Sequence, residues 1–190
     1  TPLLTAAKPL TDASYRVNGK TYSLQDYLQR QNVSGMLVLK DGKIAWKYLG
    51  QGNTDATLWT SRSVGKSVVA TLVGVAIKQG KIRSLDDLIT QYEPDLKGTA
   101  WDGVTLRQLI THTSGVAWNE DYTNPKSDFA QLTECEAKPG TYACVRKLVA
   151  GLRRAHPAGQ NWSYSSGGAW LLGDLLERAT GMPLAAYLEQ

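Results

Sequence analysis

The sequence has few of the side chains that bind transition metals. It contains two cysteines and two histidines in 190 residues, at Cys135, Cys144, His112 and His156. A structural zinc site needs four such ligands close together. Because the two histidines lie far apart and only two cysteines are present, we expect no metal site.

The sequence also lacks a basic run and an apolar run of membrane length. The net charge is +4, but the lysines and arginines are scattered, which is not the pattern of a nucleic-acid-binding surface. The longest apolar run covers residues 68–77, whereas a membrane-spanning helix needs about 20 residues. We expect neither a nucleic-acid partner nor a membrane span.

The two cysteines do not decide the cellular compartment of the protein. A Pro139-Gly140 turn lies between Cys135 and Cys144 and could bring their sulfur atoms together. The spacing fits a disulfide in an exported protein as well as it fits two free thiols. We expect a periplasmic or secreted protein, with a cytoplasmic location as the alternative.

The first part of the chain shows hairpin signals. Ser23 is typical of a helix start and predicts a short helix that ends near residue 31. Residues 35–40 and 43–48 are rich in β-forming side chains and are joined by Asp41-Gly42, which is the strongest short signal for a hairpin.

Helices dominate the prediction for the rest of the chain. We expect short helices at residues 84–89 and 105–110, and a longer helix at residues 168–179 that ends at Gly181. Residues 117–141 are polar and lack periodicity, which predicts a long loop. Antiparallel strands followed by segregated helices indicate an α+β protein. A two-stranded sheet is not stable alone, so the sheet needs strands from elsewhere.

The run SRSVGKSVVAT at residues 61–71 carries two competing signals. Gly65-Lys66-Ser67 is similar to the end of a phosphate-binding loop, but that loop requires a glycine where this chain has Thr60. Without this glycine, backbone N–H groups cannot surround a phosphate. The phosphate-loop interpretation therefore fails on spacing.

The second signal is the pair Ser63 and Lys66. Both stand at the start of the apolar run 68–77, which we interpret as a helix buried on every face. Residues three apart share a helical face, so the lysine ammonium can reach the serine hydroxyl. A desolvated lysine can take a proton from serine. A lone Ser-x-x-Lys is more often a helix cap followed by an exposed lysine.

Three strings together resemble one family. They are Ser63-Val-Gly-Lys66, TLRQLITHTSG at residues 105–115, and PAGQNWSYSS at residues 157–166, the last followed by a helix. In this order they resemble the serine β-lactamase and penicillin-binding-protein-like hydrolases, and within them the class C-type branch, which includes carboxylesterases, D-aminopeptidases and 6-aminohexanoate-dimer hydrolases. The resemblance implies a β-lactamase-like fold, an antiparallel sheet flanked by helices with a further all-helical region, and no cofactor.

The resemblance also implies roles for three residues. Ser63 would be the nucleophile, Lys66 its partner, and Tyr164 the phenol that carries protons between serine and leaving group. The reaction would cleave an ester or amide through an acyl-enzyme. We expect His112 to have a structural role at a helix end. A Ser-His-Asp triad is a competing idea, but the G-x-S-x-G sequence that would support it is absent.

Two further residues are candidates for substrate binding. Ser166 stands where relatives that hydrolyse β-lactams place asparagine, and a hydroxyl lacks the donor and acceptor pair of a carboxamide. We therefore expect esters and simple amides to be favoured over β-lactams. The loop WNEDYTNP at residues 118–125 resembles that of the nylon-oligomer hydrolases. Tyr122 would then bind a substrate amide, with a solvent-facing tyrosine as the alternative.

The sequence departs from the family in one respect. The third family element, Lys-Thr-Gly or His-x-Gly on a C-terminal strand, is not found at a suitable position. We therefore expect residues 1–190 to be the N-terminal portion of one β-lactamase-like domain, with a hairpin region at 1–60 and a helical region at 61–190. The remaining strands would be missing or would lie on a second chain of the same protein.

Two other functions are alternatives. A catalytically silent ligand-binding or sensor module would keep the pocket of this fold without turnover. The presence of Ser63, Lys66 and Tyr164 favours the enzyme. A nucleotide-binding domain would require the phosphate loop that Thr60 interrupts.

Overall fold

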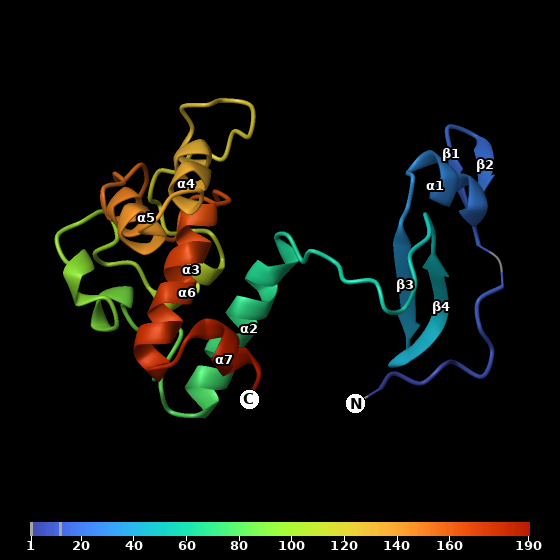
Figure 1. Ribbon diagram of the computed structural model, residues 1–190, viewed down its shortest axis with the longest axis horizontal. Coiled ribbons are helices and arrows are strands. Elements are labelled where there is room, and N and C mark those ends of the chain that lie inside the picture. Colours follow the sequence, from blue (N-terminus) through green and yellow to red (C-terminus); the bar gives the residue numbers. More distant parts are fainter. Residues whose placement is uncertain (1, 12) are drawn as a thin grey trace. The chain divides into compact units, whose positions relative to one another are not determined.

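The computed structural model describes residues 2–11 and 13–190, and the chain divides into two units, Thr1–Thr60 and Ser61–Gln190. Figure 1 shows that the β-strands of the described residues belong to the first unit and that the second unit is helical. Antiparallel strands and segregated helices make this an α+β protein, as the sequence predicts.

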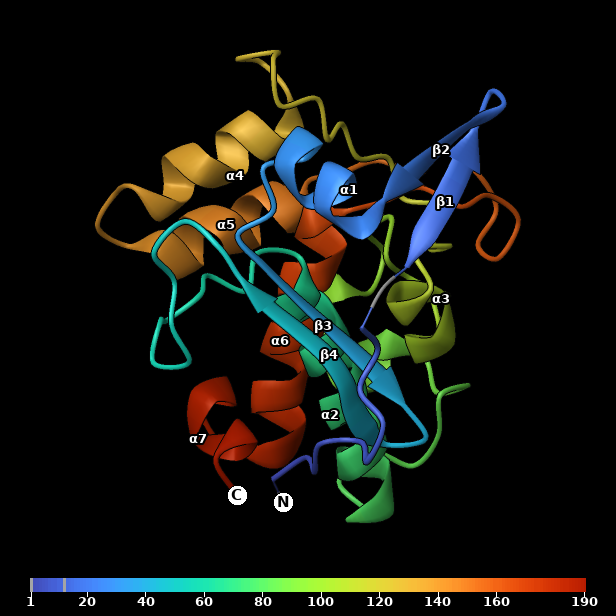
Figure 2. The ribbon, with the colours of Figure 1, turned by 90° about the vertical axis from the view of Figure 1, so that its right-hand side faces the viewer.

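Two tight turns organise the strands of the first unit. Strands β3 (Gly35–Lys40) and β4 (Lys43–Leu49) pair antiparallel, as predicted, and lie side by side in Figure 2. Asp41 and Gly42 both have positive φ, 51° and 71°, the conformation that a two-residue hairpin turn requires. The same chemistry at Asn18-Gly19 joins β1 (Ser14–Val17) to β2 (Lys20–Ser23), a hairpin that the sequence analysis overlooked.

The rest of the first unit completes these hairpins. Helix α1 (Leu24–Arg30) begins at Ser23, as predicted, because the Ser23 hydroxyl accepts a hydrogen bond from the Asp26 N–H. Along the outer edge of β4, the Ile44 N–H donates to the Leu4 carbonyl and the Ala6 N–H donates to the Ile44 carbonyl. Within the described residues, this segment is the only addition to the β3–β4 pair, so the need for further strands stays a prediction.

Helix α6 (Ser166–Thr180) is the centre of the second unit. Its leucines at 171, 172, 175 and 176 are buried, and the helix contacts α2, α3, α4, α5 and α7. Burial of each leucine stabilises the fold by about 1.5–3 kcal/mol. The surrounding helices are α2 (Val64–Lys78), α3 (Leu106–Ile110), α4 (Asp128–Glu136), α5 (Thr141–Ala150) and α7 (Leu184–Leu188), with 3₁₀ turns at η1 (Ile89–Gln91) and η2 (Pro94–Leu96).

Some helix predictions are confirmed and others are wrong. Helix α3 begins at Thr105, and α6 ends at Gly181 in a left-handed conformation, both as predicted. Residues 84–89 do not form the expected helix, because the buried Asp87 carboxylate accepts hydrogen bonds from the Ser84 N–H and the Tyr92 hydroxyl and holds a turn. Residues 117–141 are not one loop, since they contain α4.

The second unit by itself buries α2 on one face, and the burial of its other faces stays a prediction. Leu72, Val73 and Ala76 are buried, whereas Val64 and Val75 are exposed. Within the second unit α2 packs mainly against α6, and one helical neighbour can cover only one face.

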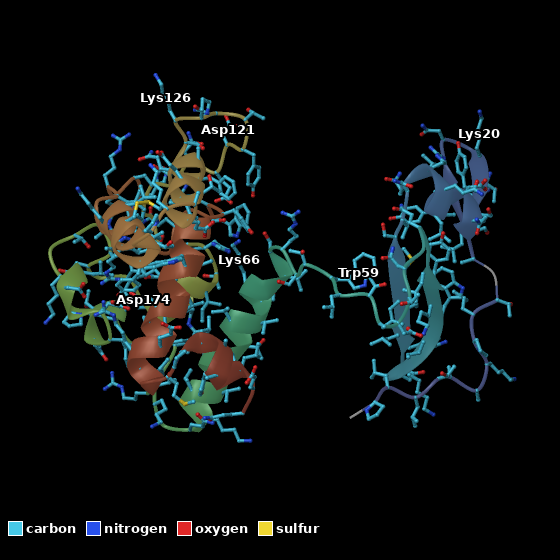
Figure 3. All side chains as sticks on the ribbon, in the orientation of Figure 1. Lys20, Trp59, Lys66, Asp121, Lys126 and Asp174 are labelled. Atoms are coloured by element: carbon cyan, nitrogen blue, oxygen red, sulfur yellow. A yellow bond between two sulfur atoms is a disulfide. The ribbon has the colours of Figure 1, made fainter. Side chains whose placement is uncertain are left out.

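The two cysteines form a disulfide, which resolves the choice that the sequence left open. Cys135 in α4 is bonded to Cys144 in α5, with 5.5 Å between their Cα atoms, and the bond is visible in yellow in Figure 3. It links two helices that both pack on α6.

A cluster of charged side chains connects η2, α5 and α6. Arg146 and Arg178 approach three carboxylates, those of Glu93, Asp95 and Asp174. Glu93 is fully buried, and neither of its oxygens has a hydrogen-bond partner, although Arg146 Nη2 lies 2.8 Å away. Burial raises the pKa of Glu93 to about 7. The positive charge of Arg146 opposes this rise, and the negative charge of Asp174 adds to it.

We therefore predict a pH-dependent contribution of Glu93 to stability. In the unfolded chain Glu93 titrates near its usual pKa of 4.5, so the stabilisation from its neutral form is complete below pH 4.5 and is lost as the pH rises through about 7. Relative to Glu93→Gln, the wild-type free energy of unfolding should fall by on the order of 3 kcal/mol across this window. Urea denaturation at several pH values measures this.

The exposed Glu134, paired with Lys138 on α4, provides the control. Glu134→Gln should leave the curve between pH 4.5 and 7 unchanged. Parallel pH curves for wild type and Glu93→Gln would contradict the prediction.

Candidate active site

Helix α2 positions the Ser63 and Lys66 pair. Ser63 occupies the N-cap position with helical dihedrals, φ −68° and ψ −11°, and its side chain makes no capping hydrogen bond. The hydroxyl is instead the acceptor for Lys66 Nζ at 3.5 Å. The arrangement thus differs from a serine cap followed by an outward lysine. Within the second unit by itself, Ser63 is exposed and Lys66 is half-buried, and full desolvation of the ammonium stays a prediction.

Lys66 also brings Tyr164 into the group. Its Nζ lies over the Tyr164 ring, 5.2 Å from the ring centre, a cation–π geometry. Figure 3 labels Lys66 on the first turn of α2. Lys66 Nζ therefore contacts both the Ser63 hydroxyl and the Tyr164 ring.

His112 holds the segment that carries Tyr164. The His112 carbonyl accepts a hydrogen bond from the Ser163 N–H at 2.8 Å, and His112 Nδ1 accepts one from the Ser165 N–H at 3.3 Å. The two rings of His112 and Tyr164 lie 4.8 Å apart. Burial and then the nearby Lys66 charge lower the pKa of His112, which keeps Nδ1 available as an acceptor. These contacts support a positioning role for His112.

Ser166 and Tyr122 meet at a residue that the sequence analysis missed, Glu120. The Ser166 hydroxyl donates to Glu120 Oε1 at 2.6 Å, and the Ser166 N–H donates to Oε2 at 2.9 Å. The Tyr122 hydroxyl donates to Oε1 at 3.0 Å, and Trp118 Nε1 donates to Oε2. Ser166 is buried and Tyr122 is exposed.

The charge of Glu120 is stabilised by these bonds. Burial alone would raise the pKa of Glu120, but the hydrogen bonds from Ser166, Trp118 and Tyr122 outweigh it and hold the pKa below its usual value. Glu120 is therefore an ionised carboxylate at neutral pH.

Ser166 and Lys66 line a common cavity. The cavity has a volume of about 300 Å³ and lies between α2, α4 and α6, with Phe129 and Trp170 also on its wall. The described residues contain no cluster of three or more histidine, cysteine or acidic side chains suited to a metal ion. In the same residues, every helix is too short or too polar to cross a bilayer.

Gly167 sets the position of the Trp118 ring. A Cβ on Gly167 would overlap the ring atoms of Trp118, whereas a Cβ on Gly173 in the same helix would meet only Leu184 at an ordinary contact distance. The glycine therefore permits the close approach that lets Trp118 donate to Glu120.

We predict that Gly167→Ala destabilises the fold by about 1–3 kcal/mol, because the ring must shift. Gly173→Ala should be neutral or stabilising, since alanine favours a helix over glycine by about 1 kcal/mol. Thermal and urea unfolding compare the two. Equal effects of both substitutions would contradict the role given to Gly167.

Comparison with known proteins identifies the family. The beta-lactamase family model matches residues 23–190. The chain is 28% identical over 174 residues to a 6-aminohexanoate-dimer hydrolase from Paenarthrobacter ureafaciens, covering 87% of the chain and 44% of that protein. It is 31% identical over 157 residues to esterase EstB from Burkholderia gladioli, covering 77% and 38% respectively.

A solved structure agrees with these relatives. A class C beta-lactamase superposes with a TM-score of 0.63 at 28% identity and covers 85% of this chain and 43% of its own. The chain thus spans less than half the length of each of these three proteins. With the family model matched from residue 23 to residue 190, the chain belongs to the beta-lactamase family.

Proposed function

We propose that this chain carries the nucleophile and the proton-transfer groups of a serine hydrolase that cleaves ester or amide bonds through an acyl-enzyme. The observation that supports this most directly is the position of Lys66 Nζ, 3.5 Å from Ser63 Oγ and 5.2 Å from the centre of the Tyr164 ring. A nucleophile needs a proton acceptor within reach, and Lys66 is in hydrogen-bond contact with Ser63, with Tyr164, which Lys66 also contacts, as a second candidate.

In the proposed reaction, Ser63 Oγ bonds to the substrate carbonyl carbon as its proton passes to the free amine form of Lys66 or to the phenolate form of Tyr164. The C–O or C–N bond then breaks, and the leaving alcohol or amine takes this proton. Water next attacks the acyl carbon, the bond to Ser63 breaks, and the serine regains its proton. The Ser63 N–H at the start of α2 would supply half of an oxyanion hole.

The second half of that hole would come from the third family element, which is not in this sequence. Because the chain spans less than half of its relatives, we propose that the remaining strands belong to the same protein, and activity is tested on the complete protein.

The substrate class is proposed from the site and the relatives. One relative is a 6-aminohexanoate-dimer hydrolase and another is an esterase. The Ser166 hydroxyl is hydrogen-bonded to Glu120 and offers no carboxamide to a β-lactam side chain. These features favour small esters and amides over β-lactams.

We predict that Ser63→Ala abolishes covalent labelling by a fluorophosphonate and lowers kcat for an ester by about 10³-fold or more. Lys66→Ala should lower kcat to a similar extent, since the two residues act as a unit. Ser67→Ala, at an exposed serine of the same helix, should leave labelling and turnover unchanged. Peptide mapping locates the adduct.

An adduct on a serine other than Ser63 would contradict the proposal. Stoichiometric labelling of Ser63 without turnover of any ester or amide would contradict the hydrolase proposal and favour the catalytically silent binding module instead.

We further propose a periplasmic or secreted location, which the Cys135–Cys144 disulfide supports because such bonds persist in oxidising compartments. Protein taken from cells and treated at once with a thiol-alkylating reagent should gain no mass until a reductant is added. Immediate alkylation of both cysteines would contradict this location.

A further inference from the structure

We propose that Cys144 is a site of thiol–disulfide exchange, at which a dithiol reversibly opens the Cys135–Cys144 bond and releases one end of α4, a wall of the cavity that contains Lys66. The consequence is weaker binding of the substrate, while Ser63 keeps its reactivity. The effect on the substrate rests on the proposed function of Ser63, whereas the exchange at Cys144 does not.

The two cysteines differ in exposure. Within the second unit by itself, Cys135 is buried, with 6% of its surface exposed, whereas Cys144 is exposed. Both line a cavity of about 540 Å³ along α4 and α5, with Lys147 and Leu148 also on its wall. Thiols attack a disulfide at the sulfur atom that they can reach. A thiol that enters this cavity is therefore expected to attack Cys144.

The exchange is a balanced transfer of two electrons. A thiolate of the dithiol attacks Cys144 Sγ, the S–S bond breaks, and its electron pair leaves with Cys135 Sγ, which takes up a proton. The second thiolate of the dithiol then attacks the reagent sulfur bonded to Cys144, and Cys144 Sγ leaves with the electron pair and takes up a proton. The protein disulfide is reduced to two thiols, and the dithiol is oxidised to a disulfide.

The short connection between the two helices makes the exchange reversible. Helix α4 ends at Glu136 and α5 begins at Thr141, so residues 137–140 alone separate them. A loop of this length keeps the two thiols close together after the bond has opened. The disulfide is therefore not needed to bring the helices together, and its effect is on how firmly α4 is held.

Helix α4 depends on the disulfide for much of its attachment. Of its nine residues, only Leu132 and Cys135 are buried. The partner helix α5 is more firmly placed, since Val145 and Val149 are fully buried and α5 packs on α6. Opening the bond removes the covalent attachment of α4 to α5 and leaves α4 held by packing alone.

The same helix forms part of the site. Phe129 and Leu132 line the cavity of about 300 Å³ that Lys66 and Ser166 also line. Leu132 is thus both a buried anchor of α4 and a part of the cavity wall. A shift of α4 after the bond opens would change the shape of this wall.

The first turn of α4 also holds the loop that carries Glu120. Asp128 Oδ2 accepts a hydrogen bond from the Asn119 N–H at 2.7 Å, and the Phe129 N–H donates to the Asn119 carbonyl at 3.1 Å. Glu120, the next residue, accepts from the Ser166 hydroxyl at 2.6 Å. The position of α4 is therefore linked by hydrogen bonds to Ser166 in the site.

The nucleophile does not depend on α4 in this way. Ser63 and Lys66 stand at the start of α2, which packs mainly against α6. Release of α4 should therefore leave the contact between Lys66 Nζ and the Ser63 hydroxyl in place. We expect the substrate KM to change and the chemical step to be kept.

The experiment uses the complete protein. One portion is reduced with dithiothreitol under native conditions, and the reagent is removed before the assay because thiols cleave 4-nitrophenyl esters. Alkylation and mass spectrometry count the free thiols. We expect both Cys135 and Cys144 to be alkylated and the KM for a 4-nitrophenyl ester to rise by about fivefold or more, with kcat and fluorophosphonate labelling of Ser63 changed by less than about twofold. Reoxidation with diamide should restore the KM.

A double variant provides the control for the reductant. Cys135→Ala with Cys144→Ala should show the raised KM both with and without dithiothreitol treatment. Circular dichroism reports whether each form is folded. If the double variant does not fold, the cycle of reduction and reoxidation of the wild type decides alone.

Three results would overturn the inference while the proposed function stands. They are a bond that resists dithiothreitol in the folded protein, a KM that is unchanged after both thiols have appeared, and unfolding on reduction, which would make the bond a structural brace. If the oxidised protein neither labels at Ser63 nor turns over an ester, the proposed function fails together with the effect on the substrate, and alkylation still reports the exchange at Cys144.

Discussion

The site depends on the hydrogen bonds that join the loop after α3 to the segment before α6. Gly115 makes this pairing possible, since it has a φ of 73° and any Cβ would overlap the His156 carbonyl. The Ala155 and His156 N–H groups both donate to the Gly115 carbonyl, and the Ser163 N–H donates to the His112 carbonyl. Without this pairing, nothing in the local sequence would place Tyr164 beside Lys66.

Side chains of opposite charge occupy different parts of the site. Lys66 is the cation beside Ser63, and Glu120 is an anion within the group that surrounds Ser166. His112 is kept neutral by burial and by the lysine charge. One cation and one anion thus take separate places in the site.

The sequence predicts those features whose causes are local. A three-residue spacing is enough to place Lys66 on the same face as Ser63, and the Asp41-Gly42 turn is enough to define a hairpin. Helix α4 was missed because its signal, Ser127 as a cap before Phe129 and Leu132, follows a long polar stretch. Glu120 could not be found, because its partner Ser166 lies 46 residues away and only the fold brings them together. The Glu93 cluster depends on similarly distant contacts.

The most direct test of the account is rapid-quench mass spectrometry of the complete protein during turnover of a 4-nitrophenyl ester. The account predicts a transient mass increase equal to the acyl group, on the peptide that contains Ser63, which forms and decays at rates that account for turnover. Turnover without any acyl adduct, or with an adduct at another residue, would contradict it.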